Sequence, residues 1–160
     1  MEFSGKTVIV TGSTRGIGRA IAERFAELGA NVMLCGTTDR VHEVVNELKS
    51  KGFNAAGFVG DLAKPGNAQA LVDQTVDVFG SLDILINNAG ITRDKLLIKM
   101  EEEDWDAVMN INLKSAFLLT KAAVKIMMKK KKGTIINISS VVGLMGNSSQ
   151  ANYAASKAGL

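Results

Sequence analysis

The stretch "KTVIVTGSTRGIGRAIAERFAELGA", residues 6–30, is the strongest indication of the fold class. It starts with a short run of β-branched residues and passes through a glycine-rich loop. It then continues as a segment (18–30) with Ile21, Phe25 and Leu28 at helical spacing. A buried strand that leads through such a loop into a helix is typical of the first unit of a nucleotide-binding α/β sheet.

The glycines of the loop "TGSTRGIG" (11–18) lie at positions 12, 16 and 18, a G-x-x-x-G-x-G spacing. Glycine permits a tight turn and lets a pyrophosphate approach the backbone. The N-terminus of the next helix offers free N–H groups and a partial positive charge. A plain strand-to-helix turn is the alternative, but three glycines in seven residues after a first strand favour a nucleotide site.

Apolar runs of strand length alternate with amphipathic segments of helix length along the rest of the chain. Besides the strand at 6–12, strands are predicted at 31–36, 53–62, 82–90 and 133–140, and helices at 39–52, 65–80, about 102–131 and 151–160. Pro65 is expected in the first turn of its helix. Five strands separated by helices predict an α/β fold, a Rossmann-type doubly wound parallel sheet. No linker interrupts the pattern, so residues 1–160 are predicted to form a single dinucleotide-binding Rossmann domain.

The composition is that of a soluble globular protein, with 46% hydrophobic and 22% charged residues. The N-terminus does not have the pattern of a signal peptide, and no apolar run reaches the length of a membrane span. The single cysteine, Cys35, excludes an internal disulfide. These features predict a cytoplasmic protein that does not enter a membrane, and no pattern predicts a metal site.

The run "KKKK" at 129–132 has two interpretations. It is expected to be a solvated helix end, where cations complement the helix dipole. The alternative is a docking site for an acidic partner. Nucleic acid is not expected as a partner, because no stacking aromatic side chains accompany the charges.

The second predicted strand bears on the choice of nucleotide. An acidic residue near its end normally binds the ribose hydroxyls. Gly36 occupies that place, and Asp39 lies three residues further on, where it can cap the next helix. Arg15, with Thr37 or Thr38, is instead placed to meet a 2′-phosphate. The pattern therefore favours NADP(H) over NAD(H).

Tyr153 and Lys157 stand four residues apart, so a helix places them on one face. A free phenol has a pKa of about 10, and a neighbouring ammonium stabilises its ionised form. Such a tyrosine can donate a proton to a carbonyl oxygen. The pair alone is weak evidence for an active site. However, "NNAG" (87–90) and "SSVVG" (139–143) follow predicted strands, and doubly wound sheets bind their ligands at the ends of strands. Asn112 adds a polar amide within the long helix.

The order TGxxxGxG, NNAG, asparagine, serine and YxxxK resembles the short-chain dehydrogenase/reductase family over the whole 160 residues. "NNAGITRD", "INISSVVGLMGN" and "QANYAASKAGL" resemble especially its 3-oxoacyl-[acyl-carrier-protein] reductases. The resemblance implies NADPH-dependent reduction of a 3-oxoacyl thioester, linked to acyl carrier protein, in fatty acid synthesis. Another ketone of the family (an acyl-CoA, a sugar or a steroid) and a non-catalytic nucleotide-binding fragment are the alternatives.

The resemblance also assigns roles to residues of this sequence. It implies that Tyr153 is the general acid and that Lys157 binds the nicotinamide ribose and favours the phenolate. Ser140 would orient the carbonyl, and Asn112 would complete a proton relay through a water. Asp61 would contact the adenine ring. The implied cofactor-binding set is Gly12, Ser13, Thr14, Arg15, Gly16, Ile17, Gly18, Thr37, Asp61, Leu62, Asn88, Ala89, Gly90, Tyr153 and Lys157.

Members of the family usually run to roughly 250 residues as one domain. This chain ends at Leu160, inside the last predicted helix and without a helix stop signal. The resemblance therefore implies a chain truncated at its C-terminus, which lacks further strands, a loop over the substrate and most contacts of a homotetramer. We expect the 160-residue chain alone to be inactive.

Overall fold

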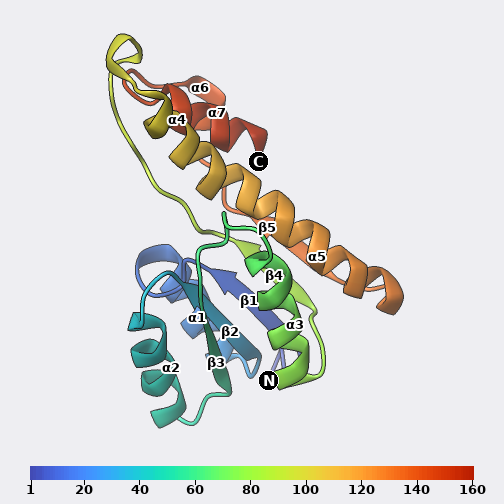
Figure 1. Cartoon of the computed structure of the whole chain (residues 1–160). Coiled ribbons are helices and arrows are strands. Elements are labelled where there is room, and N and C mark those ends of the chain that lie inside the picture. The colour runs from blue at the N-terminus through green and yellow to red at the C-terminus, as the bar shows by residue number, and fades with distance from the viewer.

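The computed structural model describes residues 1–160 as a five-stranded parallel sheet with helices on both faces (Figure 1). The strands are β1 (Thr7–Thr11), β2 (Asn31–Gly36), β3 (Ala55–Val59), β4 (Ile84–Asn87) and β5 (Thr134–Asn137). Their order in the sheet is β3-β2-β1-β4-β5, and every neighbouring pair is parallel. The order reverses between β1 and β4, which opens a crevice at the carboxyl ends of these two strands. The predicted Rossmann-type fold class is confirmed.

The predicted helices are present, most of them with slightly shorter ends. They are α1 (Gly16–Glu27), α2 (Arg40–Ser50), α3 (Asn67–Phe79), α4 (Glu102–Val108), α5 (Ser115–Lys130) and α7 (Ala151–Gly159). Two short elements were not predicted, the 3₁₀ turn η1 (Leu97–Lys99) and α6 (Val142–Met145). The helices α4, α6 and α7 gather at the end of the molecule opposite the N-terminus (Figure 1). No helix is both long enough and apolar enough to cross a membrane.

Two predictions about helix starts are wrong. Pro65 precedes α3 and does not lie in its first turn, because Gly66 has a φ of +85° that breaks the helical path before Asn67. Asp39 occupies the N-cap position of α2, but its side chain makes no capping hydrogen bond. Its backbone carbonyl accepts the N–H of His42 at 2.8 Å instead, because Asp39 already has a helical backbone.

The long helix predicted at about 102–131 contains an irregularity. A π-helical turn, η2 (Met109–Lys114), joins α4 to α5. A π turn widens the helix locally and often occurs at functional sites. Here it includes Asn112, which is 1% exposed.

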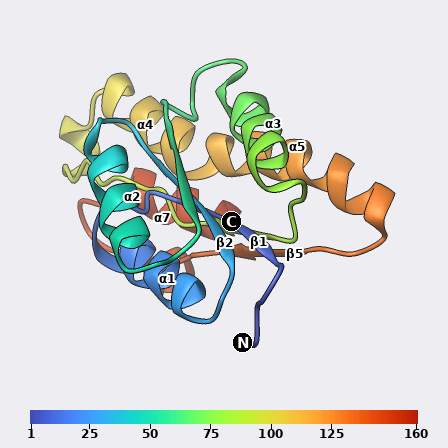
Figure 2. The ribbon, with the colours of Figure 1, turned by 90° about the horizontal axis from the view of Figure 1, so that it is seen from below.

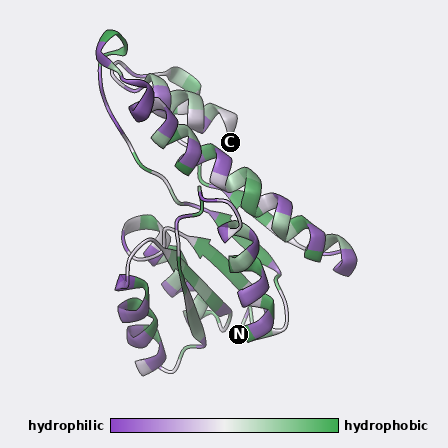
Figure 3. Cartoon of the chain, in the orientation of Figure 1, coloured by the Kyte–Doolittle hydropathy of each residue, from purple (hydrophilic) through white to green (hydrophobic).

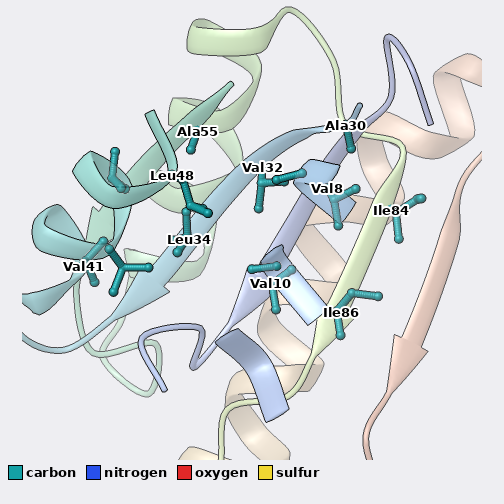
Figure 4. Close-up of a cluster of buried hydrophobic side chains, with 14 residues drawn as sticks. Val8, Val10, Ala30, Val32, Leu34, Val41, Leu48, Ala55, Ile84 and Ile86 are labelled. Atoms are coloured by element: carbon teal, nitrogen blue, oxygen red, sulfur yellow. The ribbon is translucent and has the colours of Figure 1, made fainter. Parts of the chain in front are cut away.

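The sheet separates two apolar layers because successive side chains of each strand point to opposite faces. Figure 4 shows the first layer, in which Val10, Leu34 and Ile86 belong to a cluster with residues of α1 and α2. The second layer contains Ile9 and Leu85 and is covered by α3 and α5. Figure 2 shows the two pairs of helices on opposite sides of the sheet, and Figure 3 shows hydrophobic strands between helices with hydrophilic outer faces.

Helix α1 packs on the sheet through small residues, Gly18, Ala22 and Ala26. Its larger apolar residues, which gave the helical spacing in the sequence, lie to the side. Phe25 contacts Phe3 edge to face, with ring centroids 5.0 Å apart. The neighbouring groove of about 470 Å³ is lined by Phe3, Ile17, Ala20, Ile21, Arg24, Phe25 and Leu28. We call this groove the α1 groove.

Candidate active site

The loop between β1 and α1 depends on its glycines. Gly12 and Gly16 have φ angles of +63° and +55°, in the left-handed region. A Cβ atom on Gly18 would collide with the carbonyl oxygen of Gly12 and with the side chain of Asn88. The glycines therefore let the first turn of α1, whose N–H groups have no intrahelical acceptor, approach the end of β4.

The end of β4 is fastened to the end of β1 by Asn88 and Thr11. Asn88 Nδ2 donates to the carbonyl of Thr11 at 2.8 Å and to that of Gly12 at 3.3 Å. The hydroxyl oxygen of Thr11 accepts the N–H groups of Asn88 and Ala89, both at 2.9 Å. These bonds fix the NNAG turn against the glycine loop, so both walls of the crevice are held in place.

The crevice contains a cavity of about 540 Å³. Four segments that follow strands form most of its wall. The lining residues are Gly12, Thr14, Arg15, Gly16, Ile17, Gly18, Cys35, Gly36, Thr37, Gly60, Asp61, Leu62, Ala63, Asn88, Ala89, Gly90, Ile91, Ile111 and Ser115. Of the residues expected to bind the cofactor, only Ser13, Tyr153 and Lys157 are outside this set.

Ser13 is fully buried beneath the glycine loop. Its Oγ accepts the N–H of Cys35 at 2.9 Å and donates to the carbonyl of the same residue at 3.4 Å. The side chain thus attaches the loop to the end of β2 and does not line the cavity. Burial raises the pKa of the neighbouring Cys35 thiol to about 12, so this cysteine stays protonated.

Asp61 lies in the turn that follows β3. One carboxylate oxygen accepts the N–H of Ala63 at 2.9 Å, and the carbonyl of Asp61 accepts Asn67 Nδ2 at 2.8 Å. These bonds hold the carboxylate at the cavity wall, at the β3 end of the crevice.

Asn112 joins the π turn to the segment that follows the NNAG turn. Its Oδ1 accepts the N–H of Ile91 at 2.8 Å, and its Nδ2 donates to the carbonyl of Ile91 at 3.0 Å. The second N–H of the amide is given to the hydroxyl of Ser156 at 3.1 Å. A Cβ on Gly90 would lie 3.4 Å from Asn112 Oδ1 and 3.7 Å from Lys157 Nζ. The NNAG turn, η2 and α7 therefore converge at Gly90.

Tyr153 and Lys157 lie one turn apart on α7. Lys157 Nζ is 5.8 Å from the centroid of the Tyr153 ring, and it donates to the carbonyl of Ile138 at 2.6 Å. Lys157 is only 5% exposed, and burial lowers its pKa below the usual range. The chain thus places an ammonium beside the only phenol that it contains.

Ser140 follows the end of β5 and lies close to α7. Its Oγ accepts the N–H of Val142 at 3.2 Å. The preceding residue, Ser139, donates from Oγ to the carbonyl of Lys157 at 2.6 Å. On the other side, a Cβ on Gly143 would lie 2.8 Å from the backbone of α7. Ser140 is therefore held between two contacts with the helix that carries Tyr153.

Sequence reasoning missed two buried polar residues of α7, Asn152 and Ser156, both 0% exposed. Ser156 donates to the carbonyl of Tyr153 at 2.8 Å. With Lys157 they make one face of α7 polar and buried. The sequence pattern that could have identified them is the recurrence of polar residues four and five positions apart in an alanine-rich helix. A solvated helix face has the same pattern, so the sequence alone does not show that these residues are buried.

A glycine loop at the reversal of a parallel sheet, with a cavity at the strand ends, defines a Rossmann-type α/β protein with a ligand crevice. Residues 6–160 match the model of a protein family that is described as short chain dehydrogenase. The chain belongs to this family.

Several reductases are similar to the chain over almost all of its length. The 3-oxoacyl-[acyl-carrier-protein] reductase of Vibrio cholerae serotype O1 is 48% identical over 160 residues, which is 100% of this chain and 65% of that protein. The enzyme of the same name from Escherichia coli K12 is 47% identical over the same shares. That of Staphylococcus aureus Mu50 is 46% identical over 157 residues, 97% of this chain and 64% of that protein. The chain thus spans slightly less than two thirds of the length of these relatives.

Proposed function

We propose that the 160-residue chain is the N-terminal part of a longer protein, which we call the natural protein. The natural protein is an NADPH-dependent reductase. It converts a 3-oxoacyl thioester, linked to acyl carrier protein, into the 3-hydroxyacyl thioester during fatty acid synthesis in the cytoplasm. The names of relatives that are 46–48% identical support the substrate class. The observation that carries the proposal is the convergence of the NNAG turn, Asn112 and the Tyr153–Lys157 pair at one edge of the cavity.

The crevice fits a dinucleotide. Apart from its chain neighbours and the backbone of α1, no heavy atom lies within 4 Å of the place where a Cβ of Gly16 would be, so a pyrophosphate can reach the backbone at the start of α1. Arg15 and Thr37 line the same wall, and Arg15 makes no ion pair. Because Gly36, and not an acid, ends β2, a 2′-phosphate meets no opposing carboxylate there. These features support NADP(H) over NAD(H), bound within one domain that comprises residues 1–160.

Each of three residues of the chain would then have its own role in the reduction of a ketone. The bound nicotinamide supplies the hydride. Tyr153 donates its phenolic proton to the ketone oxygen, and the Lys157 ammonium stabilises the phenolate that remains. Ser140 donates a hydrogen bond that orients the same oxygen.

Asn112 would complete the return of the proton through a water. Its two N–H groups are already committed to Ile91 and Ser156. Its Oδ1 accepts one hydrogen bond and keeps a second lone pair. That lone pair is the acceptor that this role requires.

The proposal extends to an assembly of the natural protein. The helical run of α4 and α5 exposes Trp105, Phe117 and Met128 by 39%, 60% and 71%. Large apolar side chains on an exposed helix favour burial against another subunit. We propose a homotetramer that uses this surface, whereas the 160-residue chain alone is proposed to be inactive. Light scattering on the natural protein tests the tetramer, and a turnover assay on the natural protein and on the 160-residue chain tests the difference in activity.

The test of the reaction is the variant Tyr153→Phe in the natural protein, assayed with NADPH and a 3-oxoacyl thioester. It keeps the ring beside Lys157 and removes the proton donor. We expect kcat to fall by about 100-fold, as for the loss of a general acid, with NADPH affinity nearly unchanged. A kcat close to that of the wild type would refute the role of Tyr153. Absence of turnover in the wild type would refute the reaction itself.

A further inference from the structure

Asn152, which precedes Tyr153, has a side chain whose bonds are all directed at backbone groups. Its Oδ1 accepts the N–H of Tyr153 at 2.8 Å. Its Nδ2 donates to the carbonyl of Arg93 at 3.0 Å and to that of Asp104 at 3.1 Å. Because both donors and one acceptor are used in a fully buried position, the amide has a single orientation.

These bonds connect three segments of the candidate site. Arg93 belongs to the segment that leaves the NNAG turn, Asp104 belongs to α4, and Tyr153 lies in the first turn of α7. Asn112 holds the same segment two residues earlier, at Ile91. One chain of bonds from this segment to the first turn of α7 therefore passes through Asn152, beside a second one that runs through Asn112 and Ser156.

Two of the bonds that anchor helix α7 have different consequences. At one end Asn152 fixes the first turn, and at the other Lys157 donates to the carbonyl of Ile138 at 2.6 Å. Removal of the first anchor leaves the ammonium in place and loosens the turn that carries Tyr153, which then stays tied to Asn112 only through Ser156. A shift of about 1 Å in a reacting group is enough to reduce a rate by about 100-fold.

We propose that Asn152 is a positioning residue that holds the phenol of Tyr153 at its working distance from the cavity beside Gly90. This proposal rests on the proposed function. The loop and α4 have other ties that maintain the fold, since Lys95 Nζ pairs with Asp104 at 2.6 Å and Gln150 donates to Asp94 at 2.9 Å. Loss of Asn152 therefore costs some stability but leaves the domain folded, and it loosens the position of α7.

The experiment compares Asn152→Ala with the wild type and with Gln150→Ala in the natural protein. Gln150→Ala is the matched control, because it removes an exposed bond between the same two segments. We expect Asn152→Ala to lower kcat by tenfold or more. The Kd for NADPH should stay close to the wild-type value, and the variant should stay folded with a Tm lowered by no more than about 10 °C. Gln150→Ala should leave kcat unchanged. If Asn152→Ala does not fold, Asn152→Ser replaces it. Its single hydroxyl donor cannot replace both Nδ2 bonds to Arg93 and Asp104, so the same loss of kcat is expected.

A second readout does not depend on catalysis. Native-state hydrogen exchange follows the backbone N–H of Tyr153, which should be protected in the wild type and exchange faster in Asn152→Ala, which has no acceptor for it. An unchanged kcat overturns the positioning role, and so does a parallel loss of kcat, NADPH affinity and Tm. If the wild type shows no turnover, the proposed function has failed. In that case unchanged exchange at Tyr153 overturns the inference, and faster exchange supports it.

Discussion

Lys157 is a residue of the candidate site whose burial opposes the stability of the folded chain. Its ammonium is buried, and burial lowers its pKa, so the folded chain holds this charge less readily than water does. One hydrogen bond, to Ile138, compensates in part. Charged side chains are rarely buried without a carboxylate partner, and such exceptions are concentrated at functional sites.

Arg15 gives a prediction about the choice of cofactor. Replacement by Ala should weaken NADPH binding by about 1.5–3 kcal/mol, because a charge-assisted hydrogen bond to the 2′-phosphate is lost. NADH binding should hardly change. Titration of both cofactors measures the difference, and Arg24→Ala serves as a control, since Arg24 pairs with Glu27 on the surface of the same helix. An equal loss for both cofactors would contradict the assignment.

Asp83 gives a prediction about stability and pH. Partial burial alone would raise its pKa, but hydrogen bonds from Lys130 and from the N–H of Thr7 lower it overall. The folded chain therefore binds this proton less tightly than the unfolded chain. The resulting stabilisation is present above the unfolded pKa of about 3.9 and is lost as the pH falls through the folded pKa.

The substitution Asp83→Asn should therefore reduce the free energy of unfolding by about 1–3 kcal/mol at pH 7. The difference from the wild type should shrink below a pH of about 4, and denaturant titrations at both pH values measure it. Glu27→Gln, which removes an exposed ion pair, should cost less than about 1 kcal/mol. A difference that persists at low pH would show that the carboxylate charge is not its origin.

At the scale of elements, most of the fold could be predicted because periodicity and glycine positions decide it. The strand 31–36 was predicted with the observed limits, and Val41, Val44, Val45 and Leu48 of α2 are all buried as one helical face requires. The shift to a π turn at Asn112 could not be predicted. The same residues suit either kind of helix, and contacts with Ile91 and Ser156, distant in the sequence, decide between them.

Most of the residues that line the cavity were predictable to a similar degree. The residues of the glycine loop and the Tyr153–Lys157 pair follow from local spacing. The orientation of Ser13 toward β2 and the burial of Asn152 depend on strands and loops that meet only in the folded chain. Local sequence does not contain that information.

The end of α5 carries the prediction about the acyl carrier protein. Lys130 pairs with Asp83 at 2.8 Å, whereas Lys129, Lys131 and Lys132 are exposed and unpaired. Reversal of Lys129 and Lys132 to Glu should raise KM for the carrier-linked substrate several-fold, since each exposed pair contributes about 0.2–1 kcal/mol. KM for a small thioester should not change.

High salt should reduce the effect on the carrier-linked substrate. The matched control reverses Lys49 and Lys51, two exposed lysines at the end of α2. Identical changes in KM for both substrates would show that the lysine run is only a solvated helix end.

At the scale of the molecule, one face of the sheet is incompletely covered. β5 is an edge strand, and its Ile136, which is in register with buried Ile86, is 43% exposed on the face that α1 covers only in part. The α1 groove lies on the same face. An open apolar edge of a parallel sheet invites association with another chain.

We therefore expect the 160-residue polypeptide to self-associate. Ile136→Lys should decrease the mean mass measured by light scattering, because a charge at an edge opposes pairing. Val78→Lys should have no such effect, since Val78 is exposed by 53% on α3, away from this face. A monodisperse polypeptide of 17.0 kDa would contradict the expectation.

The bond between Thr11 and Asn88 joins residues 77 positions apart, across the two central strands. A ribosome must therefore release more than half of this sequence before the second wall of the crevice can reach the first. Until then β1 can pair only with β2, and the glycine loop has no opposite wall. The nascent chain consequently acquires its ligand crevice and its central strand pairing in the same step. A dinucleotide that binds there should protect the central strands of the nascent chain from proteolysis only after the NNAG turn has emerged.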